Sequence, residues 1–290
     1  MVKKEQDRSF ISFKVKLLFT LLIAFGSWLW IERDHLQNWS SDFLSYVDNR
    51  DLLVLDAKYT PEQIIKANYS DLAGLKNGDW QEPILKYYPY LLLDIKYQEN
   101  QQSREGVLLW GMVSGEMVID TTTWENSHGF RDCLECKAGH SDFKIIQALA
   151  KNNGVMSLES LQKELQVERS SLDLWLENAK KKHLITQNGA KVQLHFENPR
   201  LLVQPQTQIN HQLVSKPSTT IIKEPRQFSR NQILTMVKAA FGEDLKVRSE
   251  QEVYLPVYSL KIVNADKSVY NAEWNAVTGQ RIYPYYLSMK

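Results

Sequence analysis

The spacing of apolar residues between positions 143 and 196 predicts three helices followed by a β-hairpin. Apolar side chains recur at helical spacing from Phe143 onward, and Gly154 marks the end of this first helix. The next two helices show the same spacing, first in Leu158, Leu161 and Leu165 and then in Leu172, Trp175, Leu176 and Ala179. Residues 185–196 then alternate apolar and polar side chains around Asn188-Gly189, which is typical of a hairpin turn.

This order of elements resembles winged helix-turn-helix domains. The resemblance implies a fold and leaves the activity open, because winged helices bind DNA in some proteins and dock other proteins elsewhere. The third helix would be the recognition helix, and Arg169 and Trp175 are its candidate partner-binding residues. Asp173 and Glu177 follow on the same helix, which argues against a reader of the DNA major groove.

Two stretches on either side of this domain match each other in three blocks. TPEQII, YYPYLLLDI and WGMVSGEMV correspond to SRNQIL, YLPVYSLKI and WNAVTGQRI. Thr60 and Ser229 have Gln three residues later, which predicts a capping box at the start of a helix. A strand that begins near a proline follows, and then a second strand that carries Trp110 or Trp274 and ends in a Ser-Gly or Thr-Gly turn. We therefore expect each repeat to be a helix on its own small antiparallel sheet.

The second repeat resembles the PepSY-like family. Its ending, NAVTGQRI at residues 275–282, is similar to that family's D-A-x-T-G-x-[IV] pattern, with Asn275 in place of the acidic residue. The first repeat departs further from the pattern. The resemblance implies extracytoplasmic binding or inhibitory domains without catalytic groups. The alternative is a small α+β sandwich that has reached the same pattern independently.

The apolar stretch at residues 11–31 is long enough to span a bilayer as a helix. Lys14 and Lys16 would reach the headgroups on one side, and Trp28 and Trp30 would lie in the opposite interface. A cleaved signal peptide and a buried core helix are the alternatives, but no small-residue cleavage site follows. Basic residues concentrate before the stretch, so the positive-inside rule places residues 32–290 outside the cytoplasm. We expect a single-pass protein of the bacterial inner membrane, with its bulk in the periplasm.

These patterns predict an α+β protein with an N-terminal transmembrane helix. The expected organisation is a cytoplasmic tail and signal anchor (1–31), a stalk (32–59), the first PepSY-like repeat (60–127), a Cys/His connector (128–140), the winged helix (141–198), an extended linker (199–226) and the second PepSY-like repeat (227–290).

One constellation carries candidate chemistry: His128, Cys133, Cys136 and His140. Two thiolates in a CxxC spacing with flanking imidazoles could complete a tetrahedral zinc site. A local disulfide or a redox pair is equally compatible with this spacing outside the cytoplasm. The run from Cys133 to Lys137 also resembles the lysine-ligated haem attachment site of cytochrome c nitrite reductases. The simplest interpretation is a buried small residue and an incidental thiol without a ligand.

Charge and motif content narrow the function. The net charge is +1 and the pI is about 7.7, which argues against nucleic acid as the partner. No hydrolase, zinc-protease or nucleotide-binding motif occurs, so we expect neither an enzyme nor a small-molecule substrate. The leading hypothesis is a membrane-anchored interaction or assembly subunit that binds the bilayer through residues 11–31 and other membrane or periplasmic proteins. The alternatives are a membrane-tethered winged-helix DNA-binding regulator and a zinc or redox protein centred on Cys133 and Cys136.

Overall fold

The computed structural model describes residues 51–68, 79–99, 102–196, 199–217, 221–242, 244–264 and 266–283. The predicted membrane segment, 11–31, lies outside these residues, together with Lys14, Lys16, Trp28 and Trp30. Most of the predicted stalk lies outside them as well. Among the residues that the structure does describe, no helix combines the length and apolar character needed to cross a bilayer.

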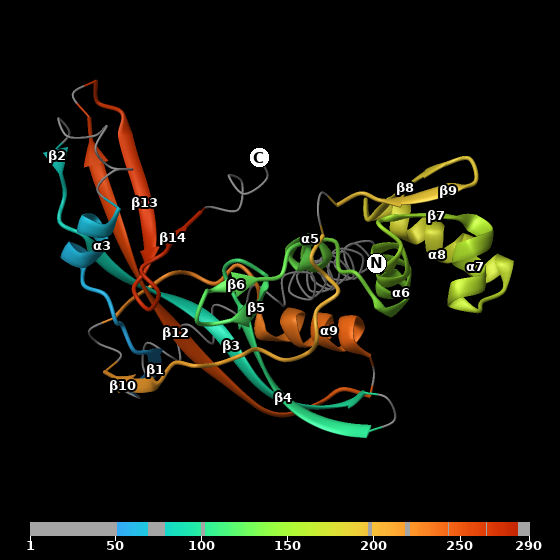
Figure 1. Ribbon diagram of the computed structural model, residues 1–290, viewed down its shortest axis with the longest axis horizontal. Coiled ribbons are helices and arrows are strands. Elements are labelled where there is room, and N and C mark those ends of the chain that lie inside the picture. The colour runs from blue at the N-terminus through green and yellow to red at the C-terminus, as the bar shows by residue number, and fades with distance from the viewer. Residues whose placement is uncertain are drawn as a thin grey trace, which may run out of the picture. The chain divides into compact units, whose positions relative to one another are not determined.

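The protein belongs to the α+β class, as predicted, and most of its regular structure is β-sheet (Figure 1). Within the described residues, one sheet has eleven strands. Seven follow the path β10-β1-β12-β3-β4-β5-β6, and β2, β11, β13 and β14 pair off this path. A second sheet has three strands in the order β7-β9-β8. The helices in the described residues are α3 (Pro61–Ala67), α5 (Phe130–Glu135), α6 (His140–Lys151), α7 (Leu158–Leu165), α8 (Arg169–Lys181) and α9 (Arg230–Phe241). The strands are β1 (Leu52–Leu55), β2 (Asp79–Trp80), β3 (Ile84–Glu99), β4 (Gln102–Gly111), β5 (Met117–Asp120), β6 (Glu125–Asn126), β7 (Val155–Ser157), β8 (Ile185–Asn188), β9 (Lys191–Leu194), β10 (Leu213–Lys216), β11 (Ile222–Lys223), β12 (Lys246–Val263), β13 (Val269–Asn275) and β14 (Arg281–Ile282).

The antiparallel pair β3–β12 at the centre of the larger sheet joins the two sequence repeats. Tyr87 lies opposite Pro256. Tyr254, the counterpart of Tyr87 in the repeat, lies opposite Pro89, the counterpart of Pro256. Exchanging the two strands therefore leaves the pairing unchanged. A local two-fold axis passes between these two pairs of residues. The repeats form one continuous sheet instead of the two separate sheets that we expect from the sequence.

The strands outside this central pair follow the same repeat. Trp110 of β4 lies opposite Met117 of β5, and Trp274 of β13 lies opposite Arg281 of β14. The predicted capping boxes at Thr60 and Ser229 are both confirmed, each with a Gln side chain that accepts from the cap's N–H. The local elements of the two repeats are thus equivalent, residue by residue.

The segment that begins each repeat crosses to the other repeat; we call β1 with α3, and β11 with α9, the two arms. β1 pairs in parallel with β12 of the second repeat, and β11 pairs in parallel with β3 of the first. The N–H of Tyr59 donates to Ala276 O at 3.0 Å, and the N–H of Phe228 donates to Met112 O at 2.9 Å. These two bonds occupy equivalent positions in the repeats, so the arms are exchanged symmetrically.

The packing of the two helices follows this exchange. Ile64 of α3 is buried in one cluster with side chains of the second repeat only, namely Leu260, Ile262, Ala272 and Trp274. Side chains of α9 belong to the same buried cluster as the first repeat's strands; they are Ile233, Met236, Val237 and Ala240. The expectation that each helix lies on its own sheet is therefore wrong. An apolar helix face shows that a cover is needed, but it does not say which strands supply the cover.

The predicted three helices and hairpin within residues 143–196 are confirmed as α6, α7, α8 and β8–β9. Ser157 caps α7 by accepting from the N–H of Ser160 at 3.1 Å. Gly154, with φ 81°, follows the end of α6. The strand β7, which pairs with β9, is not predicted, because Val155 and Met156 form too short an apolar run to indicate a strand.

The linker between residues 199 and 226 is part of the larger sheet. β10 pairs with β1, and β11 pairs with β3. The buried hydroxyl of Thr207 accepts from Leu109 N at 2.9 Å and donates to Val118 O at 2.5 Å, so it bridges β4 and β5. The sequence predicts only an extended surface connector here. The polar composition of the linker gives no sign of this strand pairing, because backbone hydrogen bonds form without apolar side chains.

Candidate protein-docking cavity

The Cys/His connector folds as the short helix α5, which the core cluster buries on one side. Phe130, Cys133 and Leu134 lie on the same face at helical spacing and are all buried. The ring of Phe130 contacts those of Trp110 and Phe143, with centroids 4.9 and 6.0 Å apart. The connector therefore ties the larger sheet to the α6–α8 helices through apolar contacts.

The four predicted metal ligands do not form a cluster. Cys133 is in the core, Cys136 is half-buried with its Sγ 3.6 Å from Cys133 O, and His140 is exposed at the start of α6. His128 pairs through its backbone with Arg200. No group of three or more His, Cys, Asp or Glu suited to a metal ion occurs among the described residues.

The two cysteines are free thiols that carry their protons at neutral pH. Burial raises the pKa of Cys133 well above its ordinary value. Burial also raises the pKa of Cys136, to about 11. Reactive cysteines instead have lowered pKa values, because the thiolate is the nucleophile and the metal ligand. The arrangement favours the simplest interpretation of this pair, a buried small residue and a second thiol beside it.

Glu116 anchors the connector, and sequence reasoning missed it. Its carboxylate is 5% exposed and accepts from the Ser127 hydroxyl at 2.6 Å and from the N–H groups of Gly129 and Arg131 at 2.9 and 3.0 Å. Burial raises the pKa of Glu116, although these hydrogen bonds act in the opposite direction. The sequence signal for this role is an acidic residue directly before the apolar run that begins β5. Its bonds to the first N–H groups of α5 are those of a structural cap.

Arg169 and Trp175, the predicted partner-binding residues, are not brought together on an open surface. Arg169 is exposed at the start of α8, and its Nε lies 3.0 Å from Asp173 Oδ1. Trp175 is half-buried, and Lys144 of α6 lies over its ring at 5.7 Å. Trp175 thus helps to pack α8 against α6.

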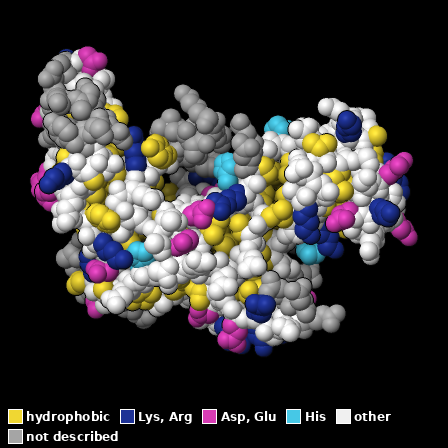
Figure 2. All heavy atoms as spheres, in the orientation of Figure 1, with side chains coloured by type: hydrophobic (Ala, Val, Ile, Leu, Met, Phe, Trp, Pro, Cys, Tyr) yellow, Lys and Arg dark blue, Asp and Glu magenta, His cyan; other side chains and the backbone are white. Residues whose placement is uncertain are grey.

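The other basic residues of α8 also have partners. Lys181 pairs with Glu177 at 2.8 Å, and Lys182, just after the helix, reaches the buried carboxylate of Asp142 at 2.6 Å. Lys180 donates to Gln187 at 3.1 Å. On the face shown in Figure 2, acidic and basic side chains alternate over the part formed by α7 and α8. The mixed charge of this visible face differs from the single-sign patch that attracts a phosphate backbone.

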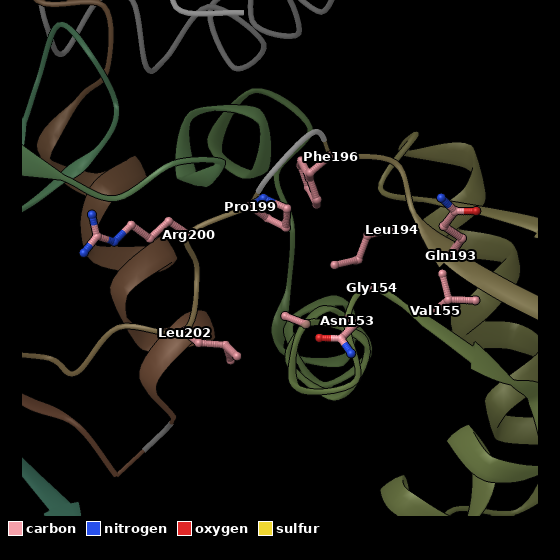
Figure 3. A pocket seen from close by; sticks show the side chains of 10 residues that line it. Asn153, Gly154, Val155, Gln193, Leu194, Phe196, Pro199, Arg200 and Leu202 are labelled. Carbon is pink, nitrogen blue, oxygen red and sulfur yellow. The ribbon is translucent and has the colours of Figure 1, made fainter.

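A cavity of about 370 Å³ lies where the end of α6 and the strands β7 and β9 face the start of the linker. Figure 3 shows Leu194, Phe196 and Pro199 on its rim, with Leu202 across from them. The complete lining is Ala150, Asn153, Gly154, Val155, Gln193, Leu194, Phe196, Pro199, Arg200 and Leu202. We call this space the wing cavity.

Both apolar and polar side chains line the wing cavity. Val155 and Leu202 in its lining are 41% and 49% exposed. Arg200 is the one charged residue of the lining, and its guanidinium is paired with Glu125. Within this lining, Val155 and Leu202 offer apolar contact beside the polar side chains of Asn153 and Gln193. Leu201, Leu202 and Val203 in an otherwise polar linker were the sequence signal for this site.

No protein-family model, curated protein or solved structure matches this chain. The resemblances to winged-helix and PepSY-like domains therefore rest on the residues and on the order of elements given above.

Proposed function

We propose that this protein is a non-catalytic interaction or assembly subunit, anchored in the bacterial inner membrane by residues 11–31 and extracytoplasmic from residue 32 onward. The basic residues before the apolar stretch support this orientation. A reporter fused after Lys290 should be active only when exported. A reporter that is active in the cytoplasm refutes the orientation.

Two finer statements about the fold belong to this proposal. The order α6-β7-α7-α8-β8-β9 supports a winged-helix domain in which β8–β9 would be the wing. The helix and strands of each repeat support a PepSY-like unit, in a version whose two halves have exchanged arms. Domains of these kinds position surfaces for partners, which agrees with a docking role.

The observation that carries the proposal is the wing cavity, in which the side chains of Val155 and Leu202 are exposed. Apolar side chains in a concave site between two segments of chain are typical of an anchor pocket at a protein interface. We propose that an apolar side chain of a partner protein fills this cavity.

The test places a photo-crosslinking amino acid at Val155 in the full chain in its membrane. The expected result is a discrete crosslinked product that Leu202→Asp abolishes, because a buried carboxylate opposes an apolar anchor. Leu174→Asp is the matched control, since Leu174 on α8 is similarly exposed at 57% and does not line the cavity. Equal products in both variants, or none in the unmodified chain, would refute the proposal.

The alternative of a tethered DNA-binding regulator has less support, because Arg169, Lys181 and Lys182 are paired with acidic side chains. It requires salt-dependent binding of duplex DNA by the full chain. Binding at low salt that is lost in Arg169→Gln would favour this alternative over protein docking.

A further inference from the structure

In the first repeat, the turn between β4 and β5 is covered by the segment that follows it. β6 pairs with β5, and Asn126 lies opposite Val118. Phe130 of α5 contacts the ring of Trp110, with centroids 4.9 Å apart. The indole N–H of Trp110 donates to Gly115 O at 2.9 Å. This turn therefore has a strand and a helix over it, and its tryptophan N–H is satisfied.

The equivalent turn of the second repeat has no such cover within the described part of the chain. β14, the counterpart of β5, pairs there only with β13. Tyr283, directly after β14, is 59% exposed. Tyr59, which lies close to Gly279 in the turn, is 40% exposed. A strand edge flanked by exposed aromatic side chains is a surface to which another strand can pair.

Three buried donors near this turn have no acceptor in the described structure, and two of them belong to one pair of residues: Nε1 of Trp274 and Nε of Arg281. The two residues lie directly opposite each other on β13 and β14, so their side chains share one face of the sheet. Arg281 also lies over the ring of Tyr270, which packs in the same cluster as Trp274. A third such donor, Nδ2 of Asn275, comes next along β13 and points to the opposite face. Buried donors without acceptors are rare and costly, so an acceptor supplied from elsewhere would stabilise the Trp274–Arg281 pair.

The chemistry of this pair selects a carboxylate. Indole and guanidinium groups donate hydrogen bonds and accept none. Arg281 forms no ion pair with a residue that the structure describes, and its guanidinium lies 5.5 and 5.0 Å from the ring centroids of Tyr270 and Tyr283. One positive charge among aromatic rings balances one carboxylate, whereas a phosphate brings more negative charge than the site can neutralise.

We propose that the β13–β14 edge binds an extended segment of a partner protein, which pairs antiparallel with β14 and places an Asp or Glu carboxylate on Trp274 and Arg281. β6 occupies the corresponding position on β5, which fixes the direction of the added strand. Tyr283 lies over the guanidinium, so the bound segment turns this ring aside. The site is separate from the wing cavity and goes beyond the docking proposed there.

The experiment measures binding of fluorescent peptides to the full chain in detergent. The peptides are about eight residues long, alternate Val and Thr, and carry a central Glu, Gln or Lys. The Glu peptide should bind about ten-fold more tightly than the Gln peptide, because its hydrogen bonds to Arg281 are charge-assisted. Arg281→Gln should remove this preference. Trp274→Phe, which keeps an aromatic ring and loses the N–H, should reduce it.

Arg248→Gln is the matched control, because Arg248 pairs with Glu105 outside this edge, and it should leave the preference unchanged. Leu202→Asp should also have no effect, which separates this test from that of the wing cavity. Equal binding of all three peptides, or binding of none, overturns the proposal. A preference that survives in Arg281→Gln overturns it too. Binding only to a chain shortened to end at Tyr283 assigns the edge to residues 284–290 in place of a partner.

Discussion

The exchange of the arms predicts which buried residues are energetically coupled. Ile64 of α3 shares a cluster with Leu260 of the second repeat, whereas Leu93, the counterpart of Leu260 in its own repeat, lies in another cluster. Ile64→Val removes one buried methyl group and should cost about 0.5–1.5 kcal/mol, and Leu260→Ala or Leu93→Ala should each cost about 2–5 kcal/mol. The mild change at Ile64 keeps the double variants folded.

A double-mutant cycle from urea unfolding separates the two pairs. The cycle of Ile64 with Leu260 should give a coupling free energy of about 0.5 kcal/mol or more, because the two side chains pack in one buried cluster. The cycle of Ile64 with Leu93 should be additive to within about 0.3–0.5 kcal/mol. Ile233→Val in α9 supplies the mirror experiment, with coupling to Leu93 and additivity with Leu260. Coupling of Ile64 to Leu93 and not to Leu260 would refute the exchange.

Three further predictions follow from single sites. Alkylation of Cys136 by iodoacetamide, measured by mass spectrometry, should be slow at pH 7 and faster as the pH rises toward the Cys136 pKa of about 11. Buried Cys133 should react only when the protein unfolds. Fast alkylation of Cys136 at pH 7 would contradict this prediction. The raised pKa of Glu116 means that the folded state binds this proton more tightly than the unfolded state does, so protonation of Glu116 adds to the unfolding free energy. This stabilisation is fully present below about pH 4.3 and is lost as the pH rises through the folded pKa. Glu116→Gln should remove that component from the pH dependence of the unfolding free energy, and an unchanged profile would disprove it. A Cβ at Gly115 would lie 2.8 Å from the Phe228 ring, against 3.3 Å from Tyr59 at Gly279, and both glycines have positive φ. Each substitution adds roughly 1–2 kcal/mol of left-handed strain, and Gly115→Ala adds a steric clash as well. Gly115→Ala should therefore lower Tm more than Gly279→Ala, and equal losses of Tm would count against the packing of Phe228 on this turn.

Local features of the fold were predictable from the sequence because their causes lie within a few residues. A Ser or Thr followed three residues later by Gln specifies a capping box, and Asn188-Gly189 specifies a tight turn. The internal repeat was visible for the same reason, since each block keeps its own Pro, Trp and Gly. These signals do not depend on which distant segment covers an apolar face.

The exchange of arms and the wing cavity were not predictable in this way. Ile64 has the same helical pattern whether it meets Leu93 or Leu260, so its spacing could not choose between the two repeats. The wing cavity depends on Leu202 of a polar linker meeting Val155 of a strand too short to be recognised. In the connector, the CxxC spacing indicates candidate ligands but says nothing of burial. The helical face that buries Phe130 and Leu134 also places Cys133 in the core.

The two-fold relation between β3 and β12 means that a chain with a single repeat would complete its sheet and seat its arm only by pairing with a second copy. Two repeats in one polypeptide achieve the same closure at any dilution, without an association step. Covalent linkage also lets corresponding positions diverge, which they cannot do in a homodimer of identical chains. Glu116 can hold the connector on one side while its counterpart Gln280 stays uncovered by any described helix, so this protein can present a different surface at each end of a nearly symmetric sheet.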